Sequence, residues 1–360
     1  MKKFSAMYKV TFNNKNSLFY DTIKANVEEY FSKNKISSTG NFKLYLKALV
    51  LIPSAIAIYS TVIFFHIHPA LSIMLCGIFG FVLACIGFNI MHDACHGSYS
   101  KKKWINYMMG LSLNCLGGNS FIWKIKHNII HHTYTNVDGV DDDIAKMPLI
   151  RQCESQKHLR IHKYQHIYTF MIYALSSFLW VFLMDFIKYF GKKITNTPIN
   201  KISTAEHIIF WVSKVLYVIF YIAVPIYFVG ALPWLLGFTA MHLVKGFTLA
   251  IVFQLAHVVE DTQFIEASLQ PKKVEQEWAI YQMNTTANFA TKNKIISWLT
   301  GGLNFQVEHH LFPRVSHVHY PAISKLLIEC CEQFGVKYIC YPTLTSAIAS
   351  HYRFMKHLGR

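Results

Sequence analysis

Histidines at metal-binding spacings are the most informative feature of this chain of 360 residues. Three clusters contain seven of its nineteen histidines: HDACH at 92–96, HNIIHH at 127–132 and QVEHH at 306–310. Neutral imidazole is the commonest protein ligand for a transition metal, and histidines four residues apart lie on one face of a helix. Because seven imidazoles exceed what one ion binds, the clusters predict a two-metal site. Capping or solvation would explain any single pair, but not three clusters beside apolar stretches.

The spacing inside each cluster indicates which side chains share an ion. His92 and His96 are four residues apart, as are His127 and His131, while His132 lies about 100° further round an α-helix. One more histidine ends an apolar stretch in the sequence QLAHVVED, at the same expected depth as the clusters, and we expect it to be a ligand rather than a core residue. The predicted ligands are His92, His96, His127, His131, His132, His257, His309 and His310.

Polar residues near the clusters are expected to support these ligands. Imidazole suits Zn, Cu, Fe and Ni, so ligand type alone does not choose the metal. A carboxylate can accept the second ring N–H of a ligating histidine, although ordinary solvated acids are the alternative. An amide three residues before His309 would bind metal weakly or orient a neighbour. The supporting candidates are Gln306, Asp93, Glu308 and Asp261, with Asp141, Asp142, Asp143 and Glu260 also near the clusters.

The composition predicts a membrane protein with sizeable polar lobes, because 53% of residues are hydrophobic and 15% are charged. Four apolar stretches reach the length of about 20 residues that a transmembrane helix needs. The connectors within each pair of stretches carry no Lys or Arg, whereas the N-terminal segment is rich in lysine, so the positive-inside rule places both termini and all clusters in the cytoplasm. The predicted spans are Leu46–Phe65, Ala70–Met91, Ile208–Val229 and Leu232–Leu255.

The predicted fold is an all-α integral membrane protein, in which four transmembrane helices carry a cytoplasmic helical cap that holds the di-metal site. No Gly/Ser-rich or Pro-rich linker divides the chain, so we expect a single domain over residues 1–360. Its expected segments are a cytoplasmic amphipathic segment (1–45), the first two spans (46–91), a cytoplasmic segment with the first two clusters (92–207), the last two spans (208–255) and a cytoplasmic segment with the third cluster (256–360).

Other apolar or amphipathic segments are expected to lie on the cytoplasmic face. A fifth apolar stretch, His166–Phe190, is interpreted as interfacial, because a fifth span would put the third cluster on the opposite side of the membrane from the other two. Trp104–Trp123 is interpreted in the same way. Ser17–Phe31 has the pattern of an amphipathic surface helix or an ordinary packed one, and Pro321–Phe334 and Thr343–Leu358 predict helices of the cap.

Polar residues inside the fourth span point to a buried channel. His242 and Lys245 are costly at membrane depth unless they face a cavity or a partner, although a lysine that reaches the interface is the alternative for Lys245. Together with Phe253, they are expected to line an apolar tunnel beside the metals.

The three clusters also carry a family resemblance. The patterns HxxxH, HxxxHH and QxxHH, in this order and separated by a pair of spans, resemble those of the integral-membrane fatty acid desaturases. The segments HHTYTNVDGVDDD, FQLAHVVED and GGLNFQVEHHLFP are similar to that family as well. Gln306 in the third pattern resembles the front-end branch, which includes bacterial linoleoyl-CoA desaturase-like proteins.

The resemblance implies chemistry that the residues alone do not specify. It implies two iron ions, O2 as co-substrate, and insertion of a cis double bond into an acyl-CoA or acyl-lipid. Many front-end desaturases carry a fused cytochrome domain, but the segment before the first span is too short for one and lacks His-Pro-Gly-Gly. We therefore expect electrons from a separate ferredoxin, cytochrome b-type protein or flavoprotein reductase, and a location in a bacterial inner membrane.

Two other functions remain open at this point. A lipid hydroxylase would use the same cluster, since both reactions begin with the same hydrogen abstraction. A histidine-rich metal transporter would place its ligands near the bilayer midplane rather than at the cytoplasmic edge. The net charge of +16 suits anionic membrane lipid, coenzyme A phosphates and an acidic redox partner. The basic residues are scattered and form no nucleic-acid-binding motif, which argues against nucleic acid as a partner.

Overall fold

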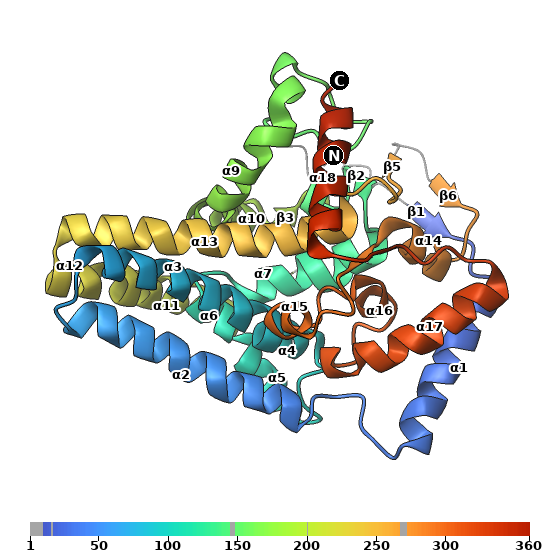
Figure 1. Ribbon diagram of the computed structural model, residues 1–360, viewed down its shortest axis with the longest axis horizontal. Helices are drawn as coiled ribbons and strands as arrows, with labels where there is room; N and C mark the ends of the chain where they lie inside the picture. The colour runs from blue at the N-terminus through green and yellow to red at the C-terminus, as the bar shows by residue number, and fades with distance from the viewer. Residues whose placement is uncertain (1–9, 16, 145–147, 200, 267–271) are drawn as a thin grey trace.

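Long parallel helices form one end of the molecule. The computed structural model describes residues 10–15, 17–144, 148–199, 201–266 and 272–360. Four helical rods run side by side, whereas shorter helices are gathered at the other end (Figure 1). The rods are α2 (Phe42–Phe64), α3 (Pro69–Ile86), α11 (Thr204–Val218) continued by η6 (Ile219–Ala223) and α12 (Val224–Val229), and α13 (Ala231–His257).

Local sequence signals set where these rods begin. The Asn41 side chain accepts a hydrogen bond from the Lys43 backbone N–H at the start of α2, and Ser203 does the same for Glu206 at the start of α11. Pro69 occupies the first turn of α3, where its missing N–H costs no helical hydrogen bond. Gly230, at φ +86°, makes the reversal between α12 and α13.

Among the described residues, five helices are long and apolar enough to cross a membrane, where the sequence predicted four spans. The fifth spans Arg160–Gly191 and contains the stretch that was expected to be interfacial. Its first part, α9 (Gln165–Leu179), crosses α13 steeply, whereas the four rods run side by side (Figure 1). Length and hydropathy therefore do not confirm the expected count of four spans. The tilt of α9 nevertheless distinguishes this helix from the four rods. The five are Phe42–Phe64, Pro69–His96, Arg160–Gly191, Thr204–Val229 and Ala231–His257.

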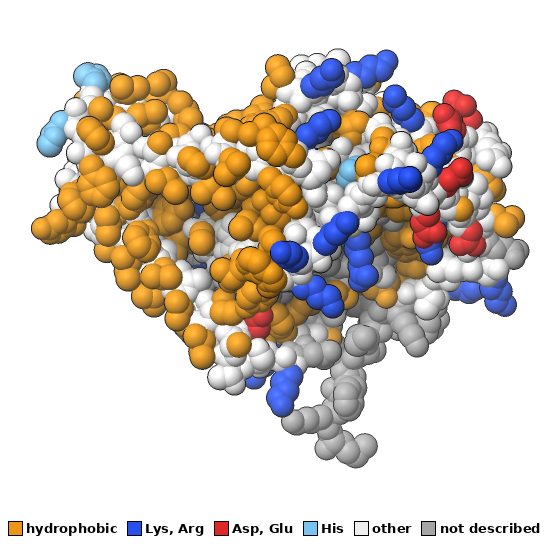
Figure 2. Space-filling model, turned by 90° about the horizontal axis from the view of Figure 1, so that it is seen from below, with side chains coloured by type: hydrophobic (Ala, Val, Ile, Leu, Met, Phe, Trp, Pro, Cys, Tyr) orange, Lys and Arg blue, Asp and Glu red, His pale blue; other side chains and the backbone are white. Residues whose placement is uncertain are grey.

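The surface divides into an apolar half and a charged half. Figure 2 shows hydrophobic side chains covering the end that holds the rods, while Lys, Arg, Asp and Glu gather at the opposite end. Leu49, Tyr227 and Leu232 are 67%, 83% and 67% exposed on the apolar half. An apolar surface of this extent is stable against lipid rather than water, so the molecule is a membrane protein.

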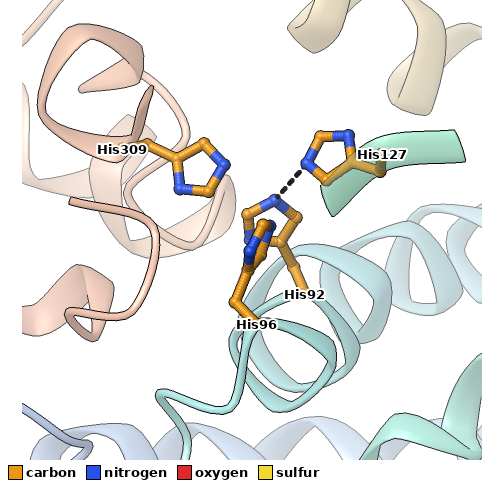
Figure 3. Close-up of side chains that lie close together, drawn as sticks. All are labelled: His92, His96, His127 and His309. Atoms are coloured by element: carbon orange, nitrogen blue, oxygen red, sulfur yellow. Dashed lines mark hydrogen bonds between the residues drawn. The ribbon is translucent and has the colours of Figure 1, made fainter. Parts of the chain in front are cut away.

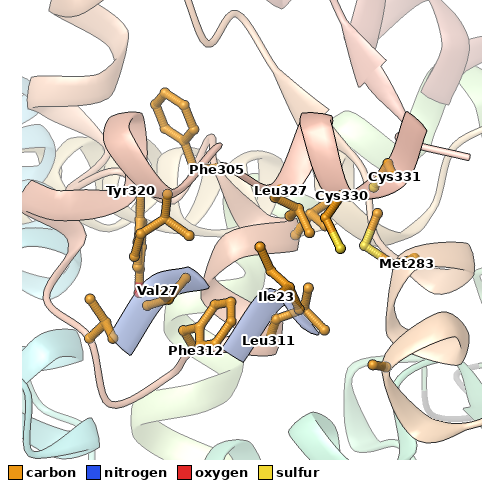
Figure 4. Packing of buried hydrophobic residues seen from close by; sticks show 14 of the residues in the cluster. Ile23, Val27, Met283, Phe305, Leu311, Phe312, Tyr320, Leu327, Cys330 and Cys331 are labelled. Atoms are coloured by element: carbon orange, nitrogen blue, oxygen red, sulfur yellow. The ribbon is translucent and has the colours of Figure 1, made fainter. Parts of the chain in front are cut away.

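The cap packs through its own hydrophobic core. Helix α1 (Leu18–Lys33) lies against α17 (Tyr320–Phe334), and Ile23 and Val27 of α1 meet Leu311 and Leu327 there (Figure 4). The amphipathic N-terminal segment is thus a packed helix. Pro321 lies in the first turn of α17 and Gly335, at φ +65°, ends it, as predicted.

Short strand pairs lie outside the rods; the parallel pairs join segments that are distant in the sequence, and the antiparallel pair is a local hairpin. The all-α expectation missed them because runs of two or three residues leave no periodic pattern to read. They consist of β1 (Val10–Phe12) with β6 (Lys272–Val274), β2 (Val137–Asp138) with β5 (Ile265–Glu266) and β7 (Asn288–Phe289) with β8 (Cys340–Tyr341), all parallel, and β3 (Lys193–Ile194) with β4 (Thr197–Pro198), antiparallel.

A helical hairpin enters the apolar half between the first two histidine clusters. It descends through α5 (Lys103–Gly110) and α6 (Ser112–Cys115), turns, and returns through α7 (Ser120–Lys124) and η2 (Ile125–His131). Residues of α6 line an apolar groove together with side chains of α2, α3 and α11, so the hairpin lies among the spans rather than on the cytoplasmic face. We call Lys103–His131 the re-entrant hairpin.

Other helices complete the described part of the chain. They are η1 (Gly87–Met91), α4 (His92–His96), α8 (His132–Tyr134), η3 (Asp142–Ile144), η4 (Arg160–Tyr164), η5 (Trp180–Met184), α10 (Asp185–Gly191), α14 (Trp278–Thr285), α15 (Lys294–Leu299), α16 (Gln306–Leu311), η7 (His317–His319) and α18 (Leu344–Leu358).

Candidate metal centre

Eight buried histidines converge where the rods meet the cap. Four of them, which we call the first group, are His92, His96, His127 and His309, and one ring nitrogen from each lies within 4.8 Å of the others. Figure 3 shows these rings facing one another from α4, η2 and α16. The second group, at the same mutual distance, is His131, His257 and His310. The structure thus brings together the histidines that the sequence singled out.

His132 lies between the two groups. Its Nε2 is 3.3 Å from Nε2 of His127, and its ring centroid is 4.5 Å from those of both His309 and His310. The second cluster forms a π-helix, η2, which is wider than an α-helix. In a π-helix the residues four and five positions apart both neighbour the first one, so His127, His131 and His132 share a side. The α-helical expectation that His132 points about 100° away is therefore corrected.

The second group is held by hydrogen bonds on the outer ring nitrogen. Nδ1 of His131 lies 3.0 Å from Asp141 Oδ2, Nδ1 of His257 lies 3.2 Å from the Thr285 carbonyl oxygen, and Nδ1 of His310 lies 2.9 Å from Gln282 Oε1. Carboxylate and carbonyl oxygens only accept, so each Nδ1 donates. Each Nε2 is then the nitrogen with a free lone pair, which is the tautomer that binds a metal.

The buried lone pairs show that the site suits cations. Nε2 of His96, His131, His257, His309 and His310 has no hydrogen-bond partner among the described residues, although each atom is buried. A buried polar atom without a partner costs free energy of about 1–3 kcal/mol. Orphaned acceptors that face one another would all be satisfied by a shared metal ion, so this donor set fits two ions bound by imidazole.

Burial also keeps most of these rings in the ligating form. Desolvation, reinforced by the neighbouring imidazoles, lowers the pKa of His127, His132, His309 and His310 well below the usual histidine range. These rings are therefore neutral at pH 7 and can bind metal. His131 differs, because Asp141 and Asp143 outweigh desolvation and raise its pKa. Such a carboxylate partner raises the basicity of a ligating imidazole, so His131 would be a strong ligand.

The predicted supporting carboxylates have other partners. Asp93 accepts hydrogen bonds from Ser316 Oγ at 2.6 Å and from the His317 backbone N–H at 3.3 Å, and so joins the first cluster to the segment after the third. Glu308 is bonded to Asn288 at 2.8 Å and Tyr338 at 2.7 Å. Asp261 lies at the surface with Lys337. These three carboxylates were expected to accept a hydrogen bond from the outer ring nitrogen of a ligand. Among the carboxylates, Asp141 has this role instead, at His131.

Gln306 lies in the first turn of α16 beside the first group. It is 1% exposed, and its amide Nε2 has no hydrogen-bond partner among the described residues. An amide N–H group donates and offers no lone pair to a metal, so this unpaired donor would suit a water molecule.

Comparison with known proteins identifies the family. The family model described as fatty acid desaturase matches residues 65–342. The chain is 34% identical to the sn-1 linoleoyl-lipid 6-desaturase of Arthrospira platensis, an alignment that covers 99% of this chain and 96% of the relative. It is 37% identical to the acyl-lipid (8-3)-desaturase of Physcomitrium patens, over 96% of this chain and 72% of the relative. The chain belongs to the fatty acid desaturase family. It is an oxidoreductase that desaturates acyl chains.

A cavity of about 410 Å³ opens beside His127 of the first group in this desaturase. Its walls come from α9, η5, α13 and the re-entrant hairpin, and they include Trp123, His127 and Phe253. Most of its surface is apolar, with Lys126, Asp142 and Lys188 among the polar residues. Phe253 lines this cavity, and its role in a substrate tunnel stays a prediction. His242 and Lys245 do not line it: His242 is bonded to Ser177 and Tyr217, both at 2.8 Å.

Sequence reasoning missed several neighbours of the desaturase ligands. Nδ1 of His309 lies 3.0 Å from the Tyr320 hydroxyl, and Gln282 and Thr285 of α14 hold two ligands of the second group. Nothing in the sequence near these residues signals such contacts. Trp123 is an exception: its ring stacks on that of His127 at 4.4 Å, and its position four residues earlier places it on the same helix face.

Proposed function

We propose that this protein is a di-iron acyl-lipid desaturase of the front-end type. Eight histidines would hold two iron ions: the first group one, the second group the other, with His132 between them. The observation that carries the proposal is the set of buried, partnerless Nε2 atoms beside an apolar cavity. The two relatives described above are named as desaturases of lipid-linked acyl chains. Their names favour a lipid ester over acyl-CoA as substrate.

The reaction converts –CH2–CH2– to –CH=CH– and reduces O2 to two water molecules, using two electrons and two protons. Bound iron would supply the activation of O2 that this hydrogen removal requires. The chain's own residues do the rest: apolar walls of α9 and α13 hold the acyl chain and exclude bulk water. Trp123 and Phe253 flank His127 at 4.4 and 6.0 Å between ring centroids, so they fix which carbons lie beside the metals.

The remaining partners follow from the surface and the chemistry. The two electrons would come from a separate ferredoxin, cytochrome b-type protein or flavoprotein reductase. The charged half of the surface (Figure 2) would face the cytoplasm, with the apolar half in the membrane. Anionic lipid would then contact the positively charged face of a chain with net charge +16.

Two measurements test this function. The purified protein, produced with ample iron, should contain about two irons per chain, as eight imidazole ligands would require. A host that expresses the chain should accumulate acyl chains with a new cis double bond on the carboxyl side of an existing one, mainly in its lipid fraction. A hydroxylated chain as the main product would support a lipid hydroxylase instead. One zinc and no iron would contradict the di-iron centre.

A control separates substrate class from activity. Desaturation of an acyl-lipid in detergent, with acyl-CoA unchanged under the same donor, would support the lipid substrate. Desaturation of acyl-CoA alone would contradict that part of the proposal while leaving the desaturase activity intact.

A further inference from the structure

Among the buried lysines of the candidate spans, two that have no part in the cavity lie beside one turn of the chain. Lys214 of α11 and Lys245 of α13 are 7% and 2% exposed, and neither lines the cavity beside His127. A cation at membrane depth is costly and persists where it meets specific polar partners. The partners of these two side chains therefore indicate what the cations do.

Both lysines donate to one turn of the backbone. Lys245 Nζ donates to the Leu116 carbonyl oxygen at 3.1 Å, and Lys214 Nζ donates to the Gly117 carbonyl oxygen at 2.7 Å. Lys214 also donates to Asp185 at 2.9 Å. Leu116 and Gly117 form the tip of the re-entrant hairpin, between α6 and α7. Two different spans thus supply donors to adjacent carbonyl groups of this tip.

The tip needs such donors because it lies among apolar side chains. Leu111 and Leu116 line a groove together with Ile86 of α3 and Leu216 of α11. Non-helical backbone at membrane depth is tolerated only where its polar groups find partners within the protein. The lysine ammonium groups provide these partners for two carbonyl groups that a helix would otherwise have satisfied.

The tip is also packed tightly against α11. Gly117 has φ +94°, and a Cβ there would lie 2.7 Å from the Tyr217 ring. Asn114 Nδ2 donates to Ser213 Oγ at 3.2 Å, and Asn114 Oδ1 accepts from the Ser120 backbone N–H at 3.2 Å. Asn114 therefore connects the first turn of α7 to α11, the helix against which the tip packs.

The position of the tip is transmitted to the metal centre. The rising arm of the hairpin, α7 and η2, begins at Ser120 and carries Trp123, His127 and His131 without a break. We propose that Lys214 and Lys245 are positioning residues, which anchor the tip of the re-entrant hairpin and thereby hold the second histidine cluster at the metal centre. This proposal rests on the proposed function in one respect: the iron measurements that test it assume the ligand set given there. It replaces the expectation that Lys245 lines a substrate tunnel.

Metal binding by lysine variants tests the proposal. Lys245→Met keeps most of the side-chain volume and removes the donor, and its one hydrogen bond among the described residues goes to the tip. We expect it to hold clearly fewer than two irons per chain, with a changed Mössbauer spectrum of the iron that His127 binds. Lys245→Arg keeps a cationic donor and should restore most of the iron. Lys103→Met, at the exposed start of the same hairpin, is the matched control and should bind iron as the unmodified protein does.

Iron content and spectrum unchanged in both Lys245→Met and Lys214→Met would overturn the proposal. A role in a tunnel predicts a different result, namely altered chain-length preference with full iron. Because iron is counted rather than turnover, unmodified protein that binds two irons and makes no double bond would contradict the proposed function and leave this proposal standing.

A second measurement needs no variant. Cys115 lies next to the tip, is exposed and lines the apolar groove, whereas Cys340 is exposed on the cap. In membranes, an uncharged thiol reagent should modify both, and a charged one only Cys340, as peptide mass spectrometry can show. Modification of Cys115 by the charged reagent would overturn the placement of the tip in the membrane, even if Lys245→Met fails to fold.

Discussion

The two groups of imidazoles differ in what holds them. Every member of the second group donates from Nδ1 to an oxygen of another element: Asp141, Thr285 or Gln282. In the first group, within the described part of the chain, only His309 has a hydrogen bond to a side chain other than histidine, that of Tyr320. Its other members pack against Trp123 and against one another, with Nε2 of His92 and His127 3.2 Å apart.

The difference matches the position of each group. The first group adjoins the cavity through His127, whereas no ligand of the second group lines it. Hydrogen-bonded rings keep their lone pairs aimed before metal arrives, and packed rings depend on the elements that carry them. We therefore expect the second group to be sensitive to the loss of single hydrogen bonds, and the first group to the position of the re-entrant hairpin.

Loss of a ligand should have the largest effect. His257→Ala removes an imidazole of the second group and leaves His131 and His310 facing an incomplete site, so turnover should fall below detection and iron content should drop. Iron analysis and lipid profiling check this. His66→Ala, at the exposed opposite end of the molecule, should change neither. Normal iron and normal turnover in His257→Ala would remove His257 from the ligand set.

Loss of the carboxylate partner should come next. Asp141→Asn keeps the shape but removes the nearer of the two carboxylate charges beside His131 Nδ1, and changes of this kind cost about 10–100-fold in metal affinity or activity. Competition with a chelator would measure the affinity. An affinity equal to that of the unmodified protein would contradict the view that hydrogen bonds organise the second group.

The corresponding change in the first group should be smaller. Tyr320→Phe removes the hydroxyl near His309 Nδ1, and a single hydrogen bond contributes about 0.5–1.5 kcal/mol, or roughly a 2–13-fold effect on metal affinity. The same chelator competition applies. An effect larger than that of Asp141→Asn would reverse the comparison between the two groups.

The smallest effect is expected at Asp261. Its carboxylate forms a surface ion pair with Lys337 at 2.6 Å, and such pairs contribute about 0–1 kcal/mol. Asp261→Asn should therefore leave iron content and turnover unchanged, as the two assays above would show. A loss of iron would restore the role that the sequence suggested for this residue.

The histidine clusters and the helices that carry them could be read from the sequence because their signals are local. Spacing of four residues, apolar runs of membrane length, and Pro321 and Gly335 at the ends of α17 each act through neighbours in the chain. The α9–α10 helix was harder to interpret, since its composition suits both a span and an interfacial helix. Its direction across α13 depends on packing that no local pattern encodes.

By itself, the sequence determined which imidazoles are available, at which helix ends they lie, and that the chain belongs in a membrane, since residue type and period decide these properties. Only the tertiary structure decided that η2 widens into a π-helix, that Gln282 and Thr285 hold ligands 28 residues away, and that Lys245 bonds a turn 129 residues away. The physical reason is that a hydrogen bond depends on position within a few tenths of an ångström, and for residues so far apart in the chain that position is set by the packing of the whole fold.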